Sequence, residues 1–254
     1  MPEWNAQQYL KFGAERTRPA SDLIARIPAE QPRKILDIGC GPGNSTNALA
    51  QRYPDADILG VDNSPAMIEA ATAACPACRF ALCDAGKELP QLKGGFDIVF
   101  SNACIQWIPD HPRVLREAMA LLNPGGVLAI QTPHNDLEPI HRIIQQVAEE
   151  NWPGLPHRIF YNLTPEAYYD LLLPVSASVT LWETTYFHVL HAHEDIMEWY
   201  RGTGLRPYLE QLSEKDRPVF EHEIFERVKH AYPCQANGDI LFRFPRLFLL
   251  AVRA

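Results

Sequence analysis

Three glycines follow an acid at alternating positions in the segment ILDIGCGPGNS, directly after a short apolar run. These residues are Asp37, Gly39, Gly41 and Gly43. Glycines at this spacing let a backbone loop approach a bound nucleotide closely. The dinucleotide pattern G-x-G-x-x-G is not met, because Asn44 stands where its third glycine would be. An acid before such a loop would repel a pyrophosphate, so it suits a ligand that carries a cationic amine.

Polar residues also end the next apolar runs, and each has chemistry that fits a nucleoside. Asp62, with Asn63 and Met67 after it, could accept the ribose hydroxyls. Asp84 could accept the adenine amino group, and the Ala85 N–H would lie near the ring. S-adenosylmethionine carries an amine, a ribose and an adenine, and so matches this order of residues.

Asn102 ends the fourth apolar run and could meet the cofactor beside the group that is transferred. Any one of these residues alone could be a helix cap or a turn residue. As a set, in order along consecutive strands, they favour a nucleoside site at the carboxyl ends of the strands.

Alternation of short apolar runs with helical patterns predicts how these residues are held. The runs at 34–39, 57–62, 78–84, 96–102 and 126–132 are continuously apolar, as parallel strands buried on both faces must be. Helix starts are indicated at Ser64-Pro65, at Asp110 with Pro112, and at Thr164-Pro165.

After residue 133 the pattern becomes helical, with strands expected at 180–190 and 247–254. A helical apolar stripe is expected from Leu137, Ile140, Ile143, Ile144 and Val147. We predict an α/β fold, Rossmann-like and doubly wound, with a mostly parallel seven-stranded sheet and a helical cap inserted between the last two strands.

The chain of 254 residues is expected to form a single domain, 1–254. Residues 30–133 would form its cofactor-binding half. The helical lid and substrate-cap segments would be 1–28, 134–178 and 192–236.

Composition narrows the class of partner. The net charge of −8 argues against a nucleic-acid surface, and no apolar run approaches the length of a membrane span. The first twenty residues contain no apolar signal region, so we expect a cytoplasmic protein with no obligate protein partner. The CPAC segment holds Cys75 and Cys78 but closes a helix and has no second cysteine pair, so we expect no metal.

With its acids and glycines, the 30–133 region resembles the class I S-adenosylmethionine-dependent methyltransferases. Segments outside it, namely WNAQQYLKFGAERTRPA, TTYFHVL, TGLRPYLE and NGDILFRFPRLFLLA, resemble the trans-aconitate 2-methyltransferase family over nearly the full length. That resemblance implies methyl transfer to one carboxylate of a small tricarboxylate. An ionised carboxylate needs no general base, so no catalytic residue is expected beyond those that position the reactants.

Candidate acceptor-binding residues follow from position in these segments. Arginines can hold non-reacting carboxylates with two parallel hydrogen bonds. The candidates are Arg18, Arg206, Arg246, Tyr186, His188, Gln106 and Trp107. Further cofactor contacts are expected from an N-terminal lid that includes Trp4, Tyr9 and Arg16.

Three alternatives stay open. Another small carboxylate could be the acceptor. A quinone or phenol could be methylated instead, with His188 as the base. The chain could also be a dinucleotide-binding oxidoreductase, although Asp37 and Asn44 speak against it.

Overall fold

The structure is a computed structural model that describes residues 13–155 and 160–254, with side chains from residue 17 onward. Seven strands form one sheet in the order β3-β2-β1-β4-β5-β7-β6. Strand β7 runs antiparallel to both of its neighbours, and the other described pairings between β1 and β5 are parallel. The predicted seven-stranded, mostly parallel sheet is confirmed. The strands are β1 (Lys34–Ile38), β2 (Asp57–Asp62), β3 (Arg79–Leu82), β4 (Phe96–Asn102), β5 (Leu122–Pro133), β6 (Ser176–Leu190) and β7 (Ile240–Arg253).

The ladder register aligns the carboxyl ends of the parallel strands. Ile38 of β1 pairs with Val61 of β2, and Asn102 of β4 pairs with Gln131 of β5. Residues that leave these strands therefore meet at one edge of the sheet, where open α/β sheets bind ligands.

Helices cover both faces of the sheet. One apolar core joins α2 (Gly13–Ile24) and α3 (Asn44–Arg52) to the sheet, and another joins α5 (His111–Leu121) and α7 (Pro165–Leu172) to it. Helix α4 (Pro65–Ala74) packs against β2 and β3. The predicted helix starts are confirmed, because Ser64, Asp110 and Thr164 each accept a backbone N–H from the first turn of the following helix.

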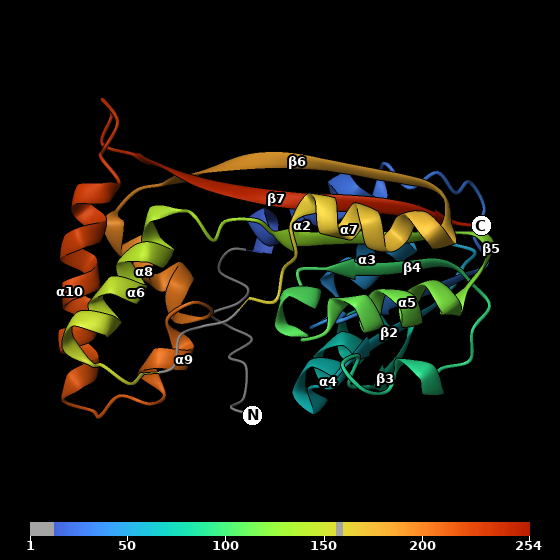
Figure 1. Ribbon diagram of the computed structural model, residues 1–254, viewed down its shortest axis with the longest axis horizontal. Helices are drawn as coiled ribbons and strands as arrows, with labels where there is room; N and C mark the ends of the chain where they lie inside the picture. Colours follow the sequence, from blue (N-terminus) through green and yellow to red (C-terminus); the bar gives the residue numbers. More distant parts are fainter. Residues whose placement is uncertain (1–12, 156–159) are drawn as a thin grey trace.

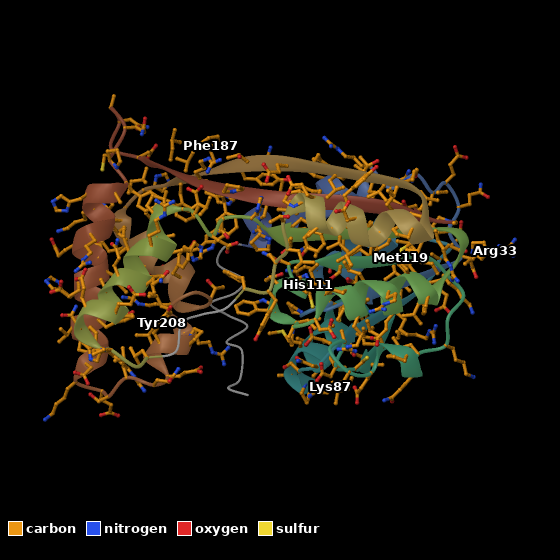
Figure 2. The ribbon with its side chains drawn as sticks, viewed as in Figure 1. Arg33, Lys87, His111, Met119, Phe187 and Tyr208 are labelled. Atoms are coloured by element: carbon orange, nitrogen blue, oxygen red, sulfur yellow. The ribbon has the colours of Figure 1, made fainter. Side chains whose placement is uncertain are left out.

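Four further helices form a cap at the far end of β6 and β7 (Figure 1). They are α6 (Pro139–Asn151), α8 (His193–Arg201), α9 (Arg206–Leu209) and α10 (Asp216–Ala231). The cap has an apolar core of its own, which includes Tyr208, whereas Met119 lies in the core beneath α5 (Figure 2). Short 3-10 turns complete the described chain at η1 (Leu89–Gln91), η2 (Ile105–Trp107) and η3 (Leu173–Val175).

The structure divides the segment 134–178, which we expected to belong to the lid as a whole. Helix α6 lies in the cap, but Tyr168 and Leu172 of α7 are buried in the core of the sheet. The expected place of Leu137 in the α6 stripe is wrong, because Leu137 precedes the helix and is 77% exposed. The last strand is also longer than predicted, since residues from Ile240 onward pair with β6 outside the parallel part of the sheet.

Among the described residues, no helix is both long and apolar enough to cross a lipid bilayer.

Candidate functional site

The glycine loop lies between β1 and α3 and depends on left-handed backbone. Gly39, Gly41 and Gly43 have φ angles of 71°, 55° and 93°. Side chains other than glycine rarely adopt such angles. Gly43 caps α3, which begins at the next residue, Asn44. The sequence thus forms a tight turn whose backbone is open on one side, since a Cβ built on Gly41 would meet no described atom within 4 Å.

Asp37 lies beneath this loop and is fully buried. Its Oδ2 accepts hydrogen bonds from Ser45 Oγ and Thr46 Oγ1, each at 2.7 Å. Its Oδ1 is buried and has no hydrogen-bond partner among the described residues. Burial, reinforced by the charge of Asp62, raises the pKa of Asp37 to about 6. Ionisation of Asp37 is therefore unfavourable in the protein without a ligand. Its Oδ1 can accept a hydrogen bond from a ligand.

Asp62 ends β2 and connects the second strand to the glycine loop. Its Oδ2 accepts the Gly41 N–H at 3.1 Å, and its Oδ1 accepts the Ser64 N–H at 2.9 Å. A carboxylate oxygen has two lone pairs, so each can accept one bond more. Of the two neighbouring candidates, Met67 is buried and Asn63 is exposed.

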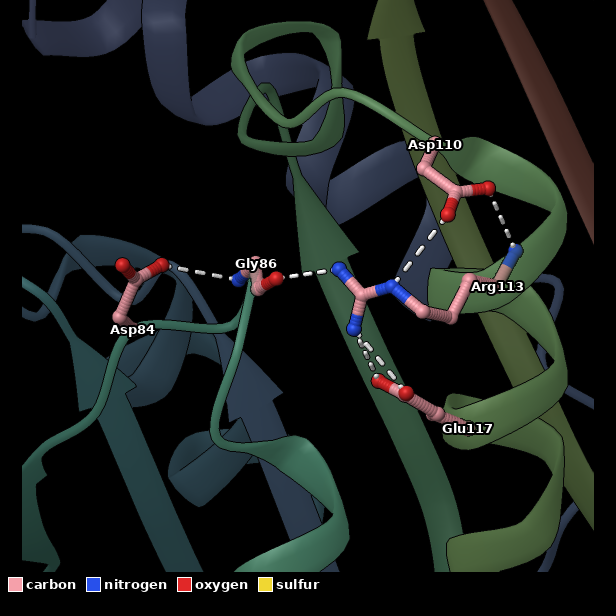
Figure 3. A network of polar contacts seen from close by, with 5 residues as sticks. All are labelled: Asp84, Gly86, Asp110, Arg113 and Glu117. Carbon is pink, nitrogen blue, oxygen red and sulfur yellow. Dashed lines mark hydrogen bonds and ion pairs between the residues drawn. The ribbon is translucent and has the colours of Figure 1, made fainter.

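The turn after β3 is anchored to α5 by one arginine. Asp84 Oδ1 accepts the Gly86 N–H at 2.9 Å, and Arg113 donates to the Gly86 carbonyl (Figure 3). Arg113 is itself held by Glu117, at 3.0 Å, and by the N-cap residue Asp110 (Figure 3). This network fixes the turn that contains Asp84 and the buried Ala85. Asp84 also forms an ion pair with Lys87 at 3.1 Å.

A cavity lies between the carboxyl ends of β4 and β5, the first half of β7 and the cap helices α6 and α8. Its sheet side contains Asn102, Gln106, Trp107 and Arg246. Ala103, beside Asn102, has a φ of 53°, and its N–H is held by the Gln131 carbonyl at 2.9 Å. Strained backbone of this kind is found mainly where function requires it.

Arg246 supplies the positive charge of the sheet side. It lies in β7 between Pro133 of β5 and Thr184 of β6, and is only 5% exposed. Its guanidinium carbon lies 4.2 Å from the centre of the Phe244 ring, which orients it within the cavity wall. A buried guanidinium at a cavity is a strong binding group for a carboxylate.

Other predicted acceptor residues lie elsewhere in the part of the chain that the structure describes. Tyr186 is buried against α2, where its hydroxyl donates to Asp22 at 2.6 Å and Arg18 lies over its ring. His188 shares the same face of β6 but packs among aromatic rings, 4.9 Å from that of Trp199. Arg206 forms an ion pair with Glu210 at 2.7 Å on α9. The structure brings none of these four candidates into the lining of the cavity described here.

The lid residues Trp4 and Tyr9 lie outside the described residues, as does the side chain of Arg16. Their expected contacts with the cofactor stay predictions.

Comparison with known proteins decides the family. The model of the "Methyltransferase domain" family matches residues 35–126. Trans-aconitate 2-methyltransferase of Escherichia coli O157:H7 is 44% identical over 100% of this chain and 99% of its own length, and that of Shigella flexneri is similar to the same extent. The chain belongs to the trans-aconitate 2-methyltransferase family.

Solved structures agree with the fold of this methyltransferase family. The YcgJ protein of Bacillus subtilis superposes with a TM-score of 0.60 at 15% identity and covers 93% of this chain and 98% of its own. Phosphoethanolamine N-methyltransferase 2 of Haemonchus contortus, in complex with S-adenosyl-L-methionine, gives a TM-score of 0.56 at 18% identity. The match covers 93% of this chain and 53% of the Haemonchus contortus chain.

The cap side of the cavity was missed by sequence reasoning. It contains Asn135, His141, Trp199, Tyr200 and Thr203. His141 lies beside the apolar stripe of α6. A polar residue at such a position was the available sequence signal for a residue of the site. Sequence spacing could not reveal that it meets Tyr200 of α8, which follows 59 residues later in the chain.

Gln131 was missed as well, although a polar residue in an otherwise apolar strand is a readable signal. It is fully buried beside Asn102, and neither polar atom of its side chain has a partner among the described residues. The Asn102 Oδ1 is equally buried and without such a partner. Buried polar groups of this kind usually indicate a bound ligand or ordered water.

Two alanine substitutions should distinguish the effect of backbone strain on stability from the effect of an added methyl group on cofactor binding. Gly41 and Gly125 both have positive φ, and a methyl group at either meets no described atom within 4 Å. We expect Gly41→Ala and Gly125→Ala to destabilise the protein alike, by about 1 kcal/mol. Only Gly41→Ala should weaken S-adenosylhomocysteine binding, by tenfold or more in calorimetry. Equal binding by both variants would show that the open side of the loop does not face the cofactor.

Among the described residues, no group of three or more His, Cys, Asp or Glu side chains is placed to hold a metal ion. Cys75 follows α4 as its C-cap, as predicted, and its sulfur lies 2.9 Å from that of Cys78. Burial raises the pKa of the Cys78 thiol to about 12, so it is a poor nucleophile at neutral pH.

Proposed function

We propose that this protein is an S-adenosylmethionine-dependent carboxyl O-methyltransferase that esterifies one carboxylate of trans-aconitate to a monomethyl ester. The full-length identity of 44% to trans-aconitate 2-methyltransferases carries the proposal. The buried Arg246 in a cavity beside the end of β4 supports it, because a polyanionic acceptor needs a fixed positive charge there.

The residues of the strand ends fit the cofactor. The buried Oδ1 of Asp37, which has no partner among the described residues, would accept the amine, and Asp62 would accept the ribose hydroxyls. Asp84 and Ala85 would hold the adenine, and Asn102 would lie near the methyl group. The glycine loop, with Asn44 at the start of α3, would hold the methionine part of the cofactor. Asn63 and Met67 would border the ribose.

S-adenosylmethionine, when bound, supplies a methyl group activated by a sulfonium. The chain itself has to bring the acceptor oxygen into line with that group, and such positioning alone is worth about 7–11 kcal/mol. A carboxylic acid with a pKa of about 4 is already ionised at neutral pH, so no residue has to remove a proton.

Arg246 would hold a carboxylate that does not react, because a guanidinium on the attacking oxygen would lower its nucleophilicity. Gln106 and Trp107 would form the wall beside the methyl group, where the amide of Gln106 is fixed by the Ala103 carbonyl at 2.8 Å. The cap and the N-terminal lid would exclude water from the site. Arg18, Tyr186, His188 and Arg206 lie outside the lining of the described cavity, and their contacts with the acceptor stay predictions.

Transfer of a labelled methyl group tests the proposal. Purified protein with labelled S-adenosylmethionine should methylate trans-aconitate and give an alkali-labile ester. Cis-aconitate, citrate, a simple phenol and a buffer blank serve as parallel acceptors. Faster transfer to the phenol would favour the alternative acceptor class. Cofactor binding without transfer to any of these acids would disprove the acceptor assignment and leave the cofactor site intact.

A further inference from the structure

Gln131 is a buried amide side chain that the chemistry above does not use. It lies in β5, two residues before the strand ends, and is fully buried. Neither its Oε1 nor its Nε2 has a hydrogen-bond partner among the described residues. Burial of an amide without hydrogen bonds destabilises a protein, so such a group points to a bound ligand or ordered water.

The strand ladder places Gln131 on the face of the sheet that lines the cavity. Gln131 pairs with Asn102 of β4, and Pro133, two residues further along β5, pairs with Arg246 of β7. Paired residues, and residues two apart on a strand, project from the same face. Asn102, Pro133 and Arg246 all line the cavity, so Gln131 lies directly beside this lining. Its burial does not set it apart, because the Oδ1 of the lining residue Asn102 is equally buried.

The main chain of Gln131 supports the same corner of the site. Its carbonyl accepts the Ala103 N–H at 2.9 Å and so holds the residue with positive φ that follows Asn102. The turn η2, which contains Gln106 and Trp107, begins two residues after Ala103. Gln131 is thus fixed relative to the wall that the proposed function places beside the methyl group.

The position of Gln131 along the sheet indicates which ligand it meets. Strand β5 lies between β4, which ends in Asn102, and β7, which carries Arg246. The proposed function places the methyl group beside Asn102 and a carboxylate that does not react on Arg246. Neighbouring strands are about 4.8 Å apart, so an acceptor that reaches from one residue to the other crosses β5 at Gln131. The carboxylate nearest to Asn102 and Gln131 is then the one that reacts.

A primary amide suits a carboxylate that has to react. The Nε2 of Gln131 has two N–H groups that can donate to an anion, and the Oε1 can accept from the amide of Asn102 across the ladder. The donor is neutral, so it fixes one carboxylate oxygen without the full charge of a guanidinium. The other oxygen keeps its lone pairs for the methyl carbon.

We propose that Gln131 donates from Nε2 to the non-attacking oxygen of the reacting carboxylate and so aligns the other oxygen with the methyl group. Gln131 and Arg246 then have different roles, because one orients the carboxylate that reacts and the other binds a carboxylate that does not. This inference rests on the proposed function and adds a residue to it.

Replacing Gln131 by methionine tests this role, because methionine has a similar length but no amide. In Gln131→Met, kcat with trans-aconitate should fall by about tenfold or more, since a misplaced oxygen attacks poorly, and the KM should rise by a smaller factor. The affinity for S-adenosylhomocysteine should stay within about twofold in calorimetry. Gln131→Glu keeps the shape but replaces the donor by an anion, so it should lower kcat at least as much and also raise the KM by repulsion.

The thermal midpoint without ligands separates this role from a structural one. Gln131→Met removes an amide that has no partner among the described residues, so its midpoint should lie above that of wild type. Asn123→Leu is the matched control at the other end of the same strand, where the amide donates to the Gly95 carbonyl at 3.2 Å and to Asp97 at 2.8 Å. Its midpoint should lie below that of wild type, with kcat and KM unchanged.

The outcomes distinguish a failure of the inference from a failure of the proposed function. If wild-type protein transfers no methyl group to trans-aconitate, the proposed function fails and the inference falls with it. If wild type is active, a wild-type kcat in Gln131→Met, or a midpoint lowered as in Asn123→Leu, disproves only the role of Gln131. A loss of S-adenosylhomocysteine affinity in Gln131→Met would place Gln131 at the cofactor and would also overturn the inference.

Discussion

Replacing Arg246 by alanine is expected to raise the KM for trans-aconitate by about a hundredfold, equivalent to about 3 kcal/mol. Arg246 is buried at the cavity, so an acceptor carboxylate that faced it would lose its charged partner in a site with little water. The affinity for S-adenosylhomocysteine should stay within about twofold, because none of the predicted cofactor residues lies on β7. Steady-state kinetics and calorimetry measure the two effects.

Two further variants make this result specific. Arg246→Lys keeps the charge but loses the planar fork, so it should recover only part of the KM. Arg206→Ala is the matched control, since Arg206 lies in another family-like segment but forms an ion pair with Glu210 outside the cavity lining. An Arg246→Ala enzyme with the wild-type KM, or an Arg206→Ala enzyme with the larger defect, would refute our assignment of the acceptor's charge partner.

Replacing Asp37 by asparagine is expected to have opposite effects on binding and on stability. Cofactor affinity should fall by about tenfold to a hundredfold, because a neutral amide replaces the carboxylate that faces the amine. The free energy of unfolding without cofactor should rise, because the substitution removes a buried charge that only two hydroxyls and no described cation compensate. A loss of cofactor affinity together with a gain in stability would indicate that the buried charge serves the cofactor at a cost to the fold.

The pH dependence of that stabilisation follows from the sign of the pKa shift. Burial raises the pKa of Asp37 from 3.8 to about 6, so the folded protein binds the proton more tightly than the unfolded chain does. The stability that this proton contributes is present below about pH 4 and is lost as the pH rises through 6. Asp37→Asn should therefore exceed wild type by little near pH 4 and by up to about 3 kcal/mol above pH 6.

Denaturant titration measures the stability of Asp37→Asn, and Asp97→Asn is the variant for which we expect the opposite change in stability. Asp97 accepts the Arg33 and Lys34 N–H groups and a bond from Asn123, which hold its pKa below the ordinary value. Its charged form stabilises the fold at neutral pH, so this variant should be less stable than wild type there. If Asp37→Asn were also destabilised at pH 7.5, or bound the cofactor as wild type does, the buried charge at Asp37 would not serve the cofactor.

The arrangement of the cofactor half can be predicted from the amino-acid sequence. Continuous apolar runs are buried on both faces only in a parallel sheet, and the carboxyl ends of parallel strands meet at one edge. Asp62 ends such a strand, Asp37 lies just before the end of one, and Asp84 follows shortly after another, so strand order alone predicts that they are neighbours. The tight turn of the glycine loop could also be predicted, because positive φ is a local property of the backbone that glycine allows.

The arrangement of the acceptor half depends on long-range packing. Arg206 and Arg246 look alike in sequence, but one pairs with Glu210 on its own helix and the other is buried at the cavity. Tyr200 and His141 are distant in the chain and meet only because α6 and α8 pack in the same apolar core. Side-chain direction in a helical cap depends on which helices pack together, and long-range packing, unlike strand order or backbone φ, leaves no local pattern in the sequence.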